Sequence, residues 1–176
     1  MLYELLLDRF DLQLLALLQQ NAHATNSEIG NALGLSASQI SRRIARLESE
    51  KVLKAYVALL DPTVMGLSVR AITYVSLARQ AADASAVFEK AVMQMPEVLD
   101  CDAVTGDSDY VLTIVAPSLA ELSDSILKQL TQIKGVSNVR TNLVLKSIKT
   151  TTALPLDHLT RPARTTRRVR VSVREA

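Results

Sequence analysis

The sequence predicts an α+β fold in which a small helical domain precedes a domain of alternating strands and helices. Two matches to the S/T-x-x-E/Q capping box, Thr25 with Glu28 and Ser36 with Gln39, predict helix starts in the first part. After residue 68 the hydrophobic period switches between about 2 and about 3.6 in a definite order, which predicts the second part. The chain has 176 residues, 48% of them hydrophobic, so one or two domains with a buried core are expected.

Three helices are expected in the N-terminal part. The first is capped by Asp8 and runs to about Gln20, with a leucine-rich apolar stripe. The second begins at about Asn26 and ends at Gly34, a residue free to take the positive φ of a C-terminal cap. Only Gly34 and Leu35 separate it from the cap of the third helix. So short a connection predicts a helix-turn-helix.

The third helix has two distinct faces. Ile40, Ile44 and Leu47 recur at i, i+4 and i+7 and are expected in the core. Hydroxyl, amide and guanidinium groups gather on the opposite side, and these groups suit contacts to bases and phosphates in a DNA major groove. The predicted DNA-binding residues are Ser36, Ser38, Gln39, Ser41, Arg42, Arg43, Arg46 and Lys51.

Within this set, Ser38, Gln39 and Arg42 are assigned to bases and Arg43, Arg46 and Lys51 to phosphates. The competing interpretation is an ordinary amphipathic helix with solvated arginines, in which Arg46 pairs with Glu50 one turn later.

The remaining elements follow from the alternation of periods. A strand at 55–60 would link the two parts, and the preferred domain boundary lies at 61–68. Strands are then expected at 69–78, 98–105, 110–116 and 136–148, and helices at 83–94 and 118–133. This order, βαββαβ, is the ferredoxin-like arrangement. Two helices cover only one face of such a sheet, so at least a dimer is expected.

Three regions result: a helix-turn-helix domain with its linker strand at 1–60, a ferredoxin-like domain at 61–151, and a basic tail at 152–176 that is expected to be largely disordered. The tail has six arginines against Asp157 and Glu175. Because Val169, Val171 and Val173 alternate with polar residues, a short terminal strand is the alternative to disorder here. Such a tail can add non-specific attraction to phosphates, or it can be a solvated appendage without a role.

Composition excludes several classes of protein. No apolar run approaches the ~20 residues of a membrane span, and the N-terminus lacks the basic start of a secretory signal. A single cysteine, Cys101, excludes an intramolecular disulfide and suits a reducing cytoplasm. Cys101, His23 and His158 do not form a recognisable metal-ligand cluster. We therefore expect a cytoplasmic protein with no metal, no cofactor and no membrane partner.

Several motifs in register resemble the Lrp/AsnC family of bacterial and archaeal transcription regulators. They are Leu7 to Asp11, Gly34 to Ser36, Ser41 to Glu48, Gly106 to Tyr110, Gly135-Val136 and Arg140-Thr141. The resemblance covers about residues 5–150. It implies a winged helix-turn-helix followed by a ferredoxin-like ligand-sensing domain, and homodimers that often assemble into tetramers or octamers.

The resemblance also implies an effector site at the Gly-Asp-x-Asp-Tyr hairpin, where a free amino acid binds between dimers. A tight glycine turn exposes N–H groups to a carboxylate, and Asp107 or Asp109 can accept hydrogen bonds from an ammonium group. The candidate effector-binding residues are Val104, Thr105, Gly106, Asp107, Asp109, Tyr110 and Thr141. An ordinary hairpin turn, with the aspartates capping local amides, is the alternative.

The resulting hypothesis is a sequence-specific regulator that binds double-stranded DNA and responds to a small effector, an amino acid. The alternative is an architectural protein that binds DNA without an effector. An enzyme is not expected, because Asp107 and Asp109 lack a histidine, lysine or nucleophile partner.

Overall fold

The computed structural model describes residues 2–78, 83–160 and 168–172 and divides the chain into two compact units. The first unit, here called the head, contains residues 1–58 together with the C-terminal segment from Thr150. The second unit, the sheet domain, contains residues 59–149. Within the described part of the chain, every helix is too short or too polar to cross a bilayer.

The head contains three helices: α1 (Arg9–Gln20), α2 (Asn26–Leu33) and α3 (Ala37–Ser49). Each begins with a complete capping box, in which the N-cap side chain accepts from the N3 backbone and the N3 side chain accepts from the N-cap backbone. The caps are Asp8, Thr25 and Ser36, so the predicted helix-turn-helix is confirmed. Gly34 ends α2 at φ 68°, in the left-handed region expected of it.

A leucine-rich core joins the three helices of the head. Leu14 of α1, Ile29 of α2, and Ile40 and Leu47 of α3 are all almost completely buried, and Ile44 packs against them. The turn between α2 and α3 packs closely against α2, since a Cβ placed on Gly30 would lie 2.5 Å from the Leu35 carbonyl oxygen.

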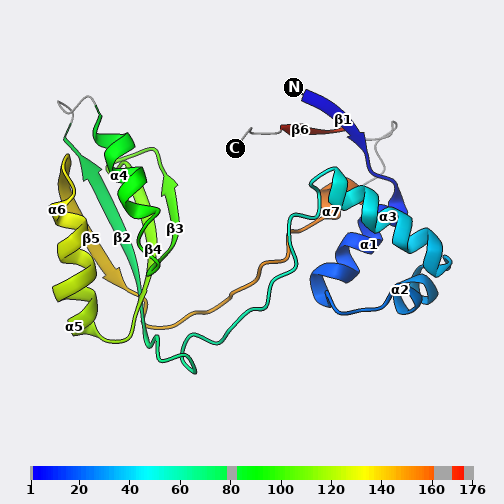
Figure 1. Ribbon diagram of the computed structural model, residues 1–176, viewed down its shortest axis with the longest axis horizontal. Coiled ribbons are helices and arrows are strands. Elements are labelled where there is room, and N and C mark those ends of the chain that lie inside the picture. Colours follow the sequence, from blue (N-terminus) through cyan, green and yellow to red (C-terminus); the bar gives the residue numbers. More distant parts are fainter. Residues whose placement is uncertain (1, 79–82, 161–167, 173–176) are drawn as a thin grey trace. The chain divides into compact units, whose positions relative to one another are not determined.

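The C-terminal segment contributes two further elements to the head. Residues 157–160 and 168–172 of the segment expected to be largely disordered form α7 (Asp157–Thr160) and β6 (Arg168–Ser172). The strand pairs antiparallel with β1 (Leu2–Leu6), which had not been predicted. Figure 1 shows this two-stranded ribbon leading directly into the helices of the head. Val173 lies outside the described residues.

The sheet domain has the predicted βαββαβ order. Its strands are β2 (Val69–Leu77), β3 (Val98–Ala103), β4 (Tyr110–Ala116) and β5 (Val136–Leu143). They form an antiparallel sheet in the order β3-β4-β2-β5, which confirms the ferredoxin-like arrangement. The helices are α4 (Ala84–Val92) and a second helix made of α5 (Leu119–Glu121), the π-helical segment η1 (Leu122–Leu127) and α6 (Lys128–Gln132).

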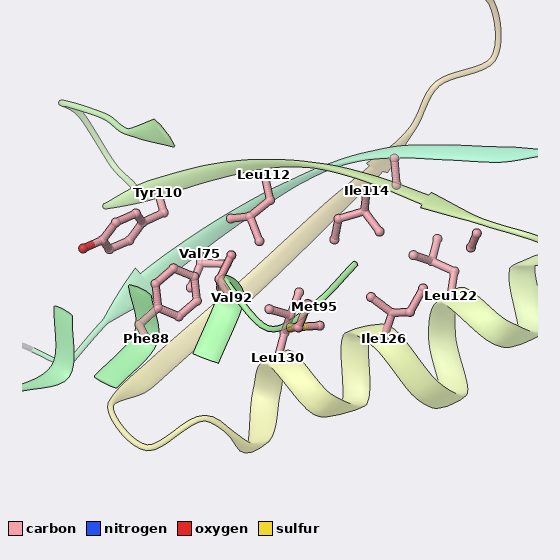
Figure 2. Packing of buried hydrophobic residues seen from close by; sticks show 12 residues of the cluster. Val75, Phe88, Val92, Met95, Tyr110, Leu112, Ile114, Leu122, Ile126 and Leu130 are labelled. Atoms are coloured by element: carbon pink, nitrogen blue, oxygen red, sulfur yellow. The ribbon is translucent and has the colours of Figure 1, made fainter. Parts of the chain in front are cut away.

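Both helices of the sheet domain pack on the same face of the sheet. Figure 2 shows Phe88 of α4 beside Tyr110 of β4, and Leu130 of α6 on the side of the sheet toward which Leu112 and Ile114 of β4 point. Phe88, Leu112, Ile114 and Leu130 are fully buried. Ile126 of the π-helical segment is part of this core. Such segments are rare in proteins, and those that occur are often found at functional sites.

The strand expected at 55–60 does not form, and this prediction is wrong. The stretch has no regular secondary structure, and Val57, Leu59 and Leu60 are exposed. An apolar run becomes a strand only where a neighbouring strand accepts and donates its backbone hydrogen bonds, and no described strand does so here. The last strand ends at Leu143 rather than at residue 148, and Leu145 and Ile148 are likewise exposed.

Candidate nucleic-acid interface and effector site

The polar face of α3 is open to solvent. Ser38, Gln39, Ser41 and Arg42 are exposed, as are Ser36 before the helix and Arg46 near its end, while Ile40 and Leu47 anchor the opposite side in the core. The pattern of the helix therefore presents the predicted base-reading residues on one surface. The same surface has a shallow depression of about 320 Å³ lined by Gln39, Arg42, Arg43 and Arg46.

A buried carboxylate fixes two of the three arginines. Asp11 of α1 is fully buried and accepts from Arg43 Nη1 at 2.6 Å and from Arg46 Nη2 at 2.5 Å. The Asp8 backbone N–H also donates to it at 2.9 Å, and Arg43 makes a second ion pair with the Asp8 carboxylate at 2.8 Å. Arg46 thus pairs with Asp11 and not with Glu50, so that part of the competing interpretation is wrong.

The ion pairs leave the two arginines unequal in their access to water. The side chain of Arg43 is 24% exposed and that of Arg46 is 42% exposed. The guanidinium of Arg43 also lies over the ring of Phe10, 5.6 Å from its centroid. Burial by itself would raise the pKa of Asp8, but the backbone hydrogen bond from Asp11 and the charge of Arg43 outweigh it and lower that pKa.

The amide oxygen of Gln39 already accepts two hydrogen bonds from Ser36. It accepts from the Ser36 backbone N–H at 2.8 Å and from the Ser36 hydroxyl at 3.0 Å, as the second half of the capping box. Bidentate pairing with adenine needs both ends of the amide, so it would require these bonds to break. In this conformation Gln39 offers a base or phosphate its Nε2 donor alone.

Lys51 follows α3 in a conformation that is uncommon for its residue type. Its φ is 58°, and the next N–H groups, those of Val52 and Leu53, donate back to the Leu47 carbonyl at 2.9 and 3.1 Å. This is the left-handed C-terminal stop that usually selects glycine. The side chain is exposed just beyond the helix, where it can reach a phosphate.

The effector candidates in the 104–109 hairpin lie together between β3 and β4. Gly106 has φ 122°, in a region that favours glycine, and Val104, Thr105, Gly106 and Asp107 are exposed. Asp109 is exposed too, and its Oδ2 accepts from the Leu77 backbone N–H at 2.7 Å. Both carboxylates are therefore exposed, and one oxygen of Asp109 is already engaged.

Tyr110 and Thr141 have different surroundings from the hairpin. The ring of Tyr110 is buried against Phe88, with centroids 4.7 Å apart, and its hydroxyl donates to Glu89 at 2.7 Å. Burial, followed by this bond to a carboxylate, raises the pKa of Tyr110. Thr141 lies on β5 with its hydroxyl 3.0 Å from that of Thr73. Tyr110 thus packs in the core at the start of β4, whereas Thr141 lies on β5, which β2 separates from β4.

Asp11 is the residue of this site that sequence reasoning missed. Asp8 was recognised as a cap, but the carboxylate at the third position of that helix was not assigned a partner. A signal was present, because Asp11 lies four residues after Leu7 and three before Leu14, on the apolar stripe of α1. A charge at a core-facing position requires an opposite charge nearby, and arginines of α3 were the available ones. Elsewhere, the described residues bring no three His, Cys, Asp or Glu side chains together as a metal site.

Comparison with known proteins agrees with this architecture. Residues 7–48 match the model of the AsnC-type helix-turn-helix domain, and residues 70–154 match that of the Lrp/AsnC ligand binding domain. A helix-turn-helix joined to a ligand-binding domain defines a transcription regulator that binds DNA. The chain belongs to the Lrp/AsnC family.

Three relatives illustrate the similarity. The chain is 34% identical to the Bkd operon transcriptional regulator of Pseudomonas aeruginosa over 150 residues, which are 85% of this chain and 98% of the relative. A transcriptional regulator of Neisseria meningitidis in complex with L-methionine has 39% identity and a TM-score of 0.84, covering 87% of this chain and 99% of that one. A feast or famine regulatory protein of Mycobacterium tuberculosis complexed with L-methionine has 29% identity and a TM-score of 0.73, covering 84% and 97%.

Proposed function

We infer that this regulator recognises its operator through α3 and that a free amino acid bound at the 104–109 hairpin alters its assembly and thereby its hold on DNA. The exposed polar face of α3 supports the proposed role in DNA binding, because Asp11 holds the guanidinium groups of Arg43 and Arg46 there through hydrogen bonds. The family match to a ligand-binding domain supports the second half.

The side chains divide into two roles on DNA. Exposed Arg42 can contact base edges, as can Ser38, whose hydroxyl is 3.1 Å from that of Ser36, and Gln39 can add a single donor while its oxygen stays in the cap. Arg43, Arg46 and Lys51, with the hydroxyls of Ser36 and Ser41, are assigned to phosphates. Because Arg43 and Arg46 are already partly neutralised by carboxylates, we expect Arg42 to be the most sensitive of the three arginines to substitution.

The effector is proposed to be an amino acid. Exposed backbone around Gly106 can hold its carboxylate, and Asp107 can accept from its ammonium group. Val104 and Thr105 would line the same site, while Asp109 and Tyr110 would keep the hairpin in position. L-methionine is the first candidate, because the similar regulators of N. meningitidis and M. tuberculosis have been solved with it.

Assembly follows from the same proposal. A homodimer would present two α3 helices to successive major grooves of a pseudo-palindromic site, and further association would give a tetramer or octamer. An effector that binds one arrangement more tightly than another shifts the population between them. Such a regulator would act in the cytoplasm, and we assign it no catalytic role.

A thermal-shift screen of the twenty amino acids tests the effector half, because a ligand of the folded state raises Tm. The expected result is a rise with one or a few amino acids that Asp107→Ala removes and that Asp100→Ala, a change of an exposed carboxylate on β3, leaves intact. If every amino acid leaves Tm unchanged, the effector assignment fails. The DNA half is tested separately, by the affinity of Arg42→Gln for a selected duplex.

A further inference from the structure

The chain returns to its DNA-binding head after the sheet domain is complete. The backbone of Leu154 makes two hydrogen bonds with the side chain of Gln19 on α1: its N–H donates to Oε1 at 2.6 Å and its carbonyl accepts from Nε2 at 3.3 Å. Leu156 then packs against the leucine core of the head, and α7 lies against α1. Residues 154–160 are therefore an integral part of the head.

The C-terminal segment ends in a strand beside the N-terminus. β6 pairs antiparallel with β1 over five residue pairs, with Arg170 opposite Glu4 and Arg168 opposite Leu6. Leu6 is two residues from Asp8, so the Cα of Arg168 lies within about 12 Å of the Cα of Asp8. Since Asp8 contacts Arg43 of α3 at 2.8 Å, the ribbon joins the head beside the recognition helix.

The charge of the segment indicates the chemistry of its partner. Residues 152–176 carry six arginines against Asp157 and Glu175, whereas residues 1–151 carry fourteen lysines and arginines against sixteen aspartates and glutamates. The excess positive charge of the chain is thus concentrated in residues 152–176, the segment that contains α7 and β6. This charge would attract a polyanion bound by the head.

We propose that the β1–β6 ribbon is a second DNA-binding element, with Arg168 and Arg170 contacting the phosphate backbone next to the major groove that α3 enters. The distance fits this role, because the groove is about 12 Å wide and phosphates line both of its edges. The ribbon supplies affinity without reading bases, since phosphate contacts position a protein but carry no sequence information. This proposal rests on the proposed function, in which α3 binds DNA.

The test is the salt dependence of DNA binding by the full chain. We would compare the wild type with Arg168→Gln/Arg170→Gln, measuring Kd over a series of KCl concentrations. The duplexes are one selected by the wild type from a random library and one of shuffled sequence. Each lost phosphate contact lowers the slope of log K against log salt by about 0.9. For the double variant, this slope should decrease by about 1 to 2 per protomer on both duplexes. The ratio of the affinities for the two duplexes should stay the same.

Three further variants keep the outcome unambiguous. Lys90→Gln/Lys128→Gln makes the same change of charge at exposed positions of α4 and α6 and should leave the slope unchanged. Arg168→Lys/Arg170→Lys preserves the charge and should keep the slope near the wild-type value. Removal of residues 161–176, which spares the contacts of Leu154 and Leu156, should lower the slope at least as much as the glutamine pair.

An unchanged slope in both the glutamine pair and the truncated chain would overturn the proposal, as would an equal loss in the control pair. The proposed function fails differently: the wild type would then show no preference for the selected duplex, or Arg42→Gln would leave that preference intact. A chain that keeps its preference but shows no ribbon-dependent slope retains the proposed function and refutes the second element.

Discussion

Replacing Asp11 with asparagine is the sharpest perturbation of the head, because that carboxylate is fully buried and accepts from both Arg43 and Arg46. Removing one partner of a buried ion pair typically costs about 3–5 kcal/mol. The cost is smaller here, because the two arginine side chains are 24% and 42% exposed and can turn to water. An asparagine also keeps one acceptor. We therefore expect a loss of about 2 kcal/mol in the stability of the head.

Amide hydrogen exchange, followed by mass spectrometry on peptides from α1 and α3, measures this loss without averaging over the sheet domain. A loss of 2 kcal/mol corresponds to exchange about 30-fold faster in the most protected amides of the head. Asp8→Asn is the matched control: it makes the same change on the same helix, keeps a good N-cap residue and breaks only one half-exposed ion pair. It should cost under about 1 kcal/mol. Equal effects of the two variants would refute the assignment of Asp11 as the centre of the network.

Three other expectations follow. The pKa of Asp8 is lowered from 3.8 in the folded state, so the Asp8 carboxylate stabilises the fold above pH 3.8 and this stabilisation is lost as the pH falls through the lower folded pKa. In acid denaturation, the difference in stability between wild type and Asp8→Asn should disappear over that range. Lys51→Gly should raise stability by about 0.5–1 kcal/mol in urea unfolding, since φ 58° suits glycine, while DNA affinity falls. Gly30→Ala should destabilise the head by about 1–3 kcal/mol, because the new Cβ meets the Leu35 carbonyl oxygen at 2.5 Å, and a Tm equal to wild type would show that the turn yields.

The parts of the fold that local chemistry determines could be predicted from the sequence. Each capping box is complete within four residues, so Thr25 with Glu28 and Ser36 with Gln39 located the starts of α2 and α3 without knowledge of the rest of the chain. The strands of the sheet domain were similarly visible as short apolar runs bounded by turns, and the Gly106 turn separated β3 from β4.

Features that depend on distant partners could not be predicted in this way. Asp11 and Arg43 are 32 residues apart, and nothing in the spacing of either helix specifies that they meet. The pairing of Leu6 with Arg168 joins opposite ends of the chain. Conversely, residues 55–60 have the composition of a strand but no described neighbour to pair with, so composition misled there. Residues 104–109 could be placed in one hairpin, but only the structure shows that Asp109 Oδ2 accepts from the Leu77 backbone N–H.

The tethering of Gln39, Arg43 and Arg46 has a consequence for the entropy of binding. Immobilising a long side chain at an interface costs about 0.5–1.5 kcal/mol when it happens on association. For these three residues much of that ordering takes place when the head folds, through Ser36 and Asp11, before DNA is present. Under the proposed function, this surface of α3 would therefore meet DNA in a nearly final arrangement. In calorimetry, loosening it through Asp11→Asn would appear as a more unfavourable binding entropy, even where the contacts to DNA are the same.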